Sequence, residues 1–208
     1  MRIDTIGLRK ALGFLSILLP IIVMVLCLIF GYGFPDSISA TYYFDATITP
    51  FMIILGASSI VLMCYKGYEK CDDILCTAAG ILGLLICLFP CDNPDLVLPT
   101  EHVGTFQLVA NISGPIHNIS AALFFILLAY NSYFLFTKTS GNMTENKKRR
   151  NIIFKACGIG MVASFILLIP VTIFDIHGGT WFVELIALGF FGLSWLTKAN
   201  TYKVLFCD

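Results

Sequence analysis

Charged side chains are scarce in this sequence. They make up 12% of the 208 residues, whereas soluble domains average about 25%. Hydrophobic residues make up 58%, and the mean hydropathy is +0.88. One soluble core of this size does not remove so much apolar surface from water, so the bilayer must solvate much of the chain. The composition therefore excludes an ordinary soluble domain and predicts an integral membrane protein.

Basic residues are absent from the centres of six apolar stretches, each near the ~20 residues that a bilayer core requires. These predicted spans are 11–31, 48–66, 73–91, 114–137, 152–174 and 180–198. All 13 Lys and Arg residues fall into tails, alternate loops or adjoining span ends: Arg2, Arg9, Lys10, Lys66, Lys70, Lys138, Lys147, Lys148, Arg149, Arg150, Lys155, Lys198 and Lys203. Basic loops stay in the cytoplasm. We therefore expect an all-α, polytopic membrane protein. It is a single domain over 1–208, a bundle of six transmembrane helices with both termini cytoplasmic, in the inner membrane of a bacterium.

Local catalytic motifs are also missing. The sequence has no HExxH zinc motif and no glycine-rich phosphate loop, and Cys71 and Cys76 are too far apart for a CxxC pair. The eight cysteines are interpreted as small apolar side chains. Nucleic-acid binding is not expected, because the basic run 147–150 adjoins a span and is typical of a topology anchor that touches anionic lipid.

The opposite face lacks Lys and Arg and carries the polar chemistry. It holds all three histidines, His102, His117 and His177, and seven acids, Asp36, Asp45, Asp92, Asp95, Glu101, Asp175 and Glu184. Acids without a basic partner attract cations. We therefore expect the functional site at this face.

Two positions lie just inside predicted spans. Glu184 is about one turn inside the last span, where an ionisable group is expensive and usually faces the protein interior. The alternative is a first-turn glutamate that the helix dipole favours, after Thr180 as N-cap. His117 and Asn118 open the fourth span behind a proline, a helix-start signature. The spacing places His117 on one face with Ser120, Ala121, Phe124, Leu128 and Asn131, and we expect that face to point into the bundle.

The hairpin between the last two spans brings Asp175 and His177 towards Glu184. We therefore predict that His117, Asn118, Asp175, His177 and Glu184 bind a ligand. His102, His117 and His177 form an alternative, a zinc site assembled from three loops, because zinc needs three or four such ligands.

Small residues predict close helix contacts in the second, third and fifth spans, at 56–59, 77–80 and 156–164. We expect these three spans to be central in the bundle. An oligomer that uses one of these faces is the alternative interpretation.

Several strings resemble a known group of proteins: residues 37–43 (SISATYY), 65–68 (YKGY), 73–75 (DIL), 88–90 (LFP) and 117–125 (HNISAALFF). They resemble small, uncharacterised bacterial six-span membrane proteins and are more distantly similar to the Frag/DRAM-like membrane families. The resemblance covers roughly residues 35–160 and implies a six-helix bundle with an outer polar cluster. It implies no particular activity.

Three functions are compatible with these features. The first is a non-enzymatic membrane protein without a cofactor that binds a lipid headgroup or cation at the outer rim, with membrane lipids as partners. The second is a zinc-dependent membrane lipid hydrolase, with a carboxylate as general base. The third is an oligomeric pore or membrane effector.

Overall fold

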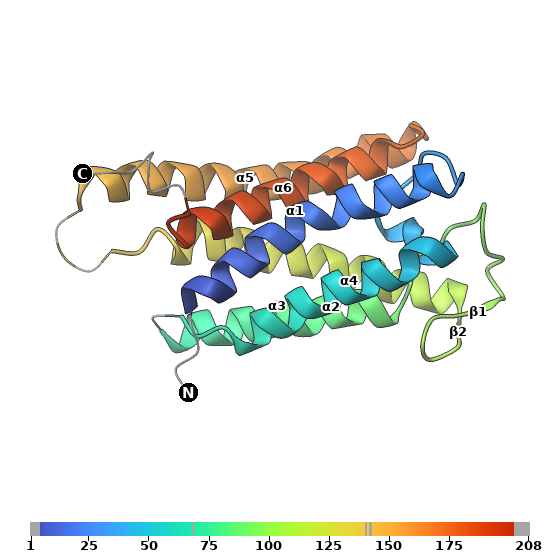
Figure 1. Ribbon diagram of the computed structural model, residues 1–208, viewed down its shortest axis with the longest axis horizontal. Coiled ribbons are helices and arrows are strands. Elements are labelled where there is room, and N and C mark those ends of the chain that lie inside the picture. The colour runs from blue at the N-terminus through green and yellow to red at the C-terminus, as the bar shows by residue number, and fades with distance from the viewer. Residues whose placement is uncertain (1–4, 68, 140, 142, 202–208) are drawn as a thin grey trace.

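Six α-helices make up most of the described part of the protein. The computed structural model describes residues 5–67, 69–139, 141 and 143–201. In these ranges each helix is long and apolar enough to cross a membrane. The helices are α1 (Thr5–Ile29), α2 (Asp45–Cys64), α3 (Lys70–Leu88), α4 (Ala110–Tyr130), α5 (Glu145–Ile173) and α6 (Gly179–Lys198) (Figure 1). A π-helical turn, η2 (Asn131–Leu135), continues α4. Outside the helices lie the 3₁₀ helix η1 (Ser39–Tyr43) and the antiparallel hairpin β1 (His102–Val103) and β2 (Leu108–Val109).

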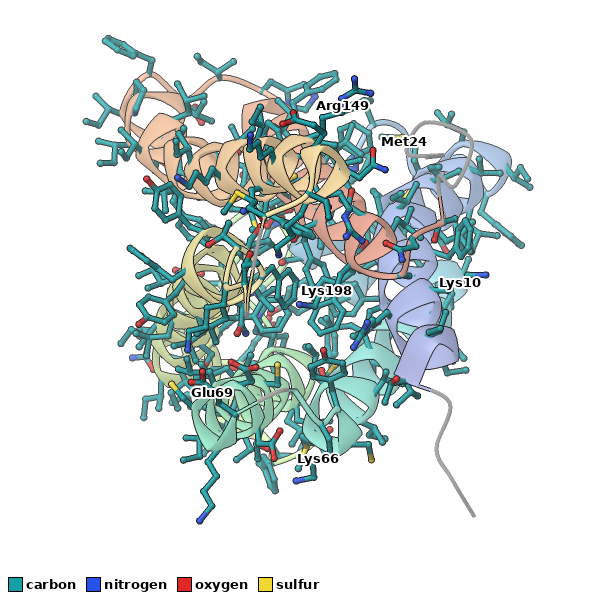
Figure 2. The ribbon with its side chains drawn as sticks, turned by 90° about the vertical axis from the view of Figure 1, so that its left-hand side faces the viewer. Lys10, Met24, Lys66, Glu69, Arg149 and Lys198 are labelled. Carbon is teal, nitrogen blue, oxygen red and sulfur yellow. The ribbon has the colours of Figure 1, made fainter. Side chains whose placement is uncertain are left out.

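The helices run alternately up and down and close into a ring. Each packs against its neighbour in sequence, and α6 packs against α1. The Lys and Arg side chains of the described residues therefore gather at one end, here called the basic end. Figure 2 shows this end, with Lys198 near the middle of the ring and Lys66 and Arg149 on opposite sides. Arg2 and Lys203 lie outside the described residues.

The far end is here called the acidic end. It carries the loop 30–38 with η1, the loop 89–101 with the hairpin, and the turn 174–178 (Figure 1). The six-helix bundle is thus as the sequence predicts, with a short hairpin added in the longest loop. Which end faces the cytoplasm stays a prediction from the charges.

The ring has no central helices, so the expectation that the second, third and fifth spans are central is wrong. The helix with the largest buried share of its apolar segment is α6, at 50%. It packs tightly on α1, because a Cβ at Gly192 would lie 2.5 Å from Ser16 Oγ and 2.9 Å from the Gly13 carbonyl oxygen. The small residues of α2 and α3 serve the contact between neighbours, where a Cβ at Gly80 would lie 2.5 Å from the Ser59 carbonyl oxygen.

Helix boundaries differ from the predicted spans where polar residues extend a helix beyond the apolar segment. The fifth helix begins at Glu145 instead of 152, because Thr144 caps it: the Thr144 hydroxyl accepts a hydrogen bond from the Lys147 backbone N–H at 3.3 Å. The N-cap of α6 is Gly178, with φ of 68°, so the expectation that Thr180 caps this helix is wrong.

Aromatic side chains fill the bundle towards the basic end. The fully buried ring of Trp195 contacts Tyr65, Phe136 and Phe191 at centroid distances of 4.9, 5.2 and 6.3 Å. Lys198 lies over the ring of Phe136 at 4.6 Å, a cation–π geometry at the end of α6. The half of the bundle towards the acidic end is packed differently, and it contains a cavity.

Candidate binding cavity at the acidic end

The cavity has a volume of about 700 Å³, within the ~300–1,000 Å³ range of small-molecule sites. Its mouth lies between the loops 36–38, 91–95 and 175–178. Its floor is apolar and includes Leu19, Phe51, Leu55, Phe124, Phe125, Phe165 and Leu188. Along α4 the lining runs from His117 to Phe125, a rise of roughly 12 Å at ~1.5 Å per residue. The cavity therefore joins a polar mouth to an apolar interior.

Glu184 holds the loop 36–38 against α6. Its Oε2 accepts a hydrogen bond from the Ile38 backbone N–H at 2.5 Å, and its Oε1 accepts one from the Ser39 hydroxyl at 3.2 Å. Next to it, the backbone N–H of Trp181 donates to the Asp36 carbonyl oxygen at 2.9 Å. The carboxylate thus satisfies the start of η1 and fixes one side of the mouth.

His117 holds the loop 89–92 against α4. It is 97% buried by exposed area, and its Nδ1 lies 2.8 Å from the Phe89 carbonyl oxygen. A carbonyl only accepts, so Nδ1 carries the proton and Nε2 is the acceptor nitrogen of the neutral ring. The Ser113 hydroxyl donates to the Pro90 carbonyl oxygen at 2.9 Å from one turn earlier on α4. The face of α4 predicted to point inwards does so, since His117, Ser120 and Phe124 are all buried.

Tyr43 connects these two sides. Its hydroxyl donates to the Cys91 carbonyl oxygen at 2.5 Å, which ties η1 to the loop after α3. Burial raises the pKa of the Tyr43 hydroxyl, so the group stays protonated and remains a donor. Burial likewise raises the pKa of the Cys91 thiol, which keeps that thiol neutral and unreactive.

Five carboxyl side chains line the cavity, and no Lys or Arg does so within the described part of the chain. Asp36 Oδ1 lies 2.8 Å from His177 Nδ1, and Asp92 accepts a hydrogen bond from the Asn118 amide at 3.3 Å. Glu184 is the third, already described. The remaining two, Asp95 and Asp175, have side chains without a hydrogen-bond or ion-pair partner among the described residues. These two carboxylates are available to a ligand.

All five predicted ligand-binding residues line this one cavity: His117, Asn118, Asp175, His177 and Glu184. Their individual roles differ, because Glu184 and His117 hold loops while Asp175 is unengaged. The prediction omitted Asp36, Asp92 and Asp95. Their signal was present in the acidic excess of this face, but the sequence does not show which acids turn into a common cavity.

The three histidines proposed for zinc are not gathered in the cavity. His117 and His177 line it, whereas His102 is exposed on β1 and is not part of the lining. Across the ranges that the structure describes, no group of three or more His, Cys, Asp or Glu side chains is arranged to hold a metal ion. The zinc alternative stays a prediction without support from side-chain geometry.

Comparison with known proteins finds no family model, no curated protein and no solved structure that matches this chain. The resemblance to six-span bacterial proteins therefore stays a prediction from short strings.

Proposed function

We propose that this multi-pass membrane protein binds, without catalysing a reaction, a ligand with a cationic headgroup in the cavity at its acidic end. The observation that carries the proposal is the combination of five carboxyl side chains, no lining Lys or Arg among the described residues, and an apolar floor in one cavity of about 700 Å³. A cation placed at the mouth meets carboxylates on more than one side, and an apolar group attached to it reaches the aromatic floor.

The two unengaged carboxylates supply the selectivity. Asp95 and Asp175 can bind a cation without breaking an existing hydrogen bond. Asp36 and Asp92, in contrast, already have partners. Partly exposed ion pairs contribute about 0.2–1 kcal/mol each. Two such pairs therefore amount to roughly a tenfold change in the dissociation constant, which corresponds to about 1.4 kcal/mol.

The test is calorimetric titration of octyltrimethylammonium into the purified protein in maltoside micelles, with the heat of mixing into empty micelles subtracted. We expect saturable binding to the wild type and binding roughly tenfold weaker in the double variant D95N/D175N. The matched control is Asp45→Asn, because Asp45 is an exposed acid at the same end that does not line the cavity. That variant should bind like the wild type.

Two outcomes would contradict the proposal. One is the absence of saturable binding to the wild type. The other is equal loss of affinity in D45N and D95N/D175N, which would mean that the ammonium group responds to general surface charge and not to this cavity.

A further inference from the structure

The side of the cavity between α4 and α5 differs from its other sides. These two helices contact each other near the basic end, where a Cβ at Gly158 would lie 2.9 Å from the Ala129 carbonyl oxygen. They meet again at mid-height, where the rings of Phe125 and Phe165 lie 5.3 Å apart. Much of the packing of α5 against this part of the chain is made by η2, the continuation of α4 at the basic end. Figure 1 shows the two helices diverging towards the acidic end.

Above these two rings both helices line the cavity. Ala121 and Asn118 contribute from α4, and Leu168 and Thr172 contribute from α5. Ala121 and Leu168 are half-buried, while Asn118 and Thr172 are exposed. This side of the cavity wall, formed by residues of α4 and α5, is here called the α4–α5 gap.

The last turn of α5 has a chemical reason to separate from α4. Pro170 lies within it and has no backbone N–H, so the carbonyl of Ile166 lacks its usual partner in the helix. Such a helix bends more easily at that point. On both sides of the gap the outward-facing neighbours are exposed apolar residues, Ile119 on α4 and Leu167 and Ile169 on α5. In a membrane these exposed apolar neighbours would meet lipid chains, so this side of the cavity borders the bilayer.

We propose that the ligand is a membrane amphiphile with an ammonium headgroup, and that its hydrocarbon chain lies in the α4–α5 gap and extends into the bilayer. This inference rests on the proposed function of the cavity and adds the class of ligand and its route. The ammonium lies at the carboxylates of the mouth, and the chain passes Leu168 and the rings of Phe125 and Phe165.

The charge of the cavity restricts the headgroup further. A lipid whose head carries only negative charge would bring its phosphate among five carboxyl side chains with no Lys or Arg in the described lining. Like charges in such proximity repel. Lipids with a terminal ammonium are therefore selected over lipids with a glycerol head, although the hydrocarbon chains are the same.

The test uses the full protein in nanodiscs that contain a trace of phosphatidylethanolamine with a photoreactive diazirine in its acyl chain. After irradiation, mass spectrometry locates the cross-links. We expect them to concentrate on α4 and α5 around the α4–α5 gap, above the level found on the lipid-facing residues Ile21 and Val25 of α1, which are 49% and 47% exposed. Phosphatidylglycerol with the same chain should show no such concentration.

Two variants separate a specific gap from general lipid contact. Leu168→Trp fills the gap and should abolish the concentrated cross-links. Leu167→Trp is the matched control, because Leu167 is the neighbouring residue on the lipid-facing side of α5, is 51% exposed and does not line the cavity. It should cross-link like the wild type. Leu167→Trp should also keep its affinity for tetramethylammonium, a headgroup without a chain.

The results distinguish the inference from the function on which it rests. Suppose that the wild type binds tetramethylammonium but its cross-links are spread evenly over α1, α4 and α5, or are unchanged by L168W. Either result would overturn the route through the gap and leave the cation site intact. Saturable binding of octyltrimethylammonium without any concentrated lipid cross-link would assign the site to soluble cationic amphiphiles and overturn the assignment to a membrane lipid. Failure of both ammonium compounds to bind would remove the proposed function itself.

Discussion

Glu184 offers a sharp test of how the cavity is built, because the geometry assigns it a structural role. Its two oxygens accept hydrogen bonds from the Ile38 backbone N–H at 2.5 Å and from the Ser39 hydroxyl at 3.2 Å. Glu184→Ala removes both acceptors and leaves the buried start of η1 without partners. Glu184→Gln keeps one oxygen acceptor and places an amide NH₂ where the second acceptor was.

The size of the effect follows from these two bonds. Leaving a hydrogen-bond donor without its acceptor costs about 1–3 kcal/mol, and a value near the middle of this range applies to each of the two donors because Glu184 is only half-buried. We therefore expect Glu184→Ala to lower the free energy of unfolding by about 3 kcal/mol. In a chain of this size that corresponds to a fall of about 8 °C in melting temperature. Glu184→Gln should cost about 1 kcal/mol, because one acceptor survives.

The assay is thermal unfolding in maltoside micelles, followed by circular dichroism at fixed protein and detergent concentrations. Asp175→Asn is the control, since the Asp175 side chain lines the same cavity without a partner among the described residues and Asn tolerates the positive φ of 46° at this position. It should melt like the wild type. Equal melting temperatures for Glu184→Ala and Asp175→Asn would refute the assignment of Glu184 as the tie between α6 and the loop 36–38.

The helix ring and its orientation give two further predictions. Gly192→Val should lower the unfolding free energy by about 1–3 kcal/mol, because a side chain there meets Gly13 and Ser16 of α1. Gly189→Val is the matched control on the same helix, since a Cβ at Gly189 has no neighbour within 4 Å, and equal melting of the two variants would contradict the tight α1–α6 contact. For orientation, Cys64 and Cys71 are exposed near the basic end, so an impermeant maleimide should label them in lysed but not in intact cells; labelling of intact cells would reverse the predicted topology.

The fold was predictable because it depends on two strong signals. Apolar length fixed the six helices, and the alternation of basic loops fixed their up-and-down order. The arrangement of the helices was not predictable. Small residues at 56–59 and 77–80 indicate that a helix approaches closely, but they do not identify its partner or its place in the ring. In this ring the glycines serve pairs of neighbours, such as Gly13 with Gly192.

The sequence predicted at which end of the bundle the site lies, but not what each of its residues does there. The absence of Lys and Arg pointed to the acidic end, and the five predicted residues line one cavity there. The sequence did not show that Glu184 and His117 are occupied by the backbone of distant loops, because those contacts span 146 and 28 residues. Nor did it show that Asp95 and Asp175 are the acids left unengaged.

The central claim is that the cavity selects positive charge. The most direct measurement compares the dissociation constants of octyltrimethylammonium and of its neutral isostere, in which carbon replaces the nitrogen. The two compounds have the same shape and chain, so a difference reports the charge alone. We predict that the wild type binds the ammonium compound roughly tenfold more tightly and that D95N/D175N binds the two equally. Equal affinity of the wild type for both compounds would contradict the account.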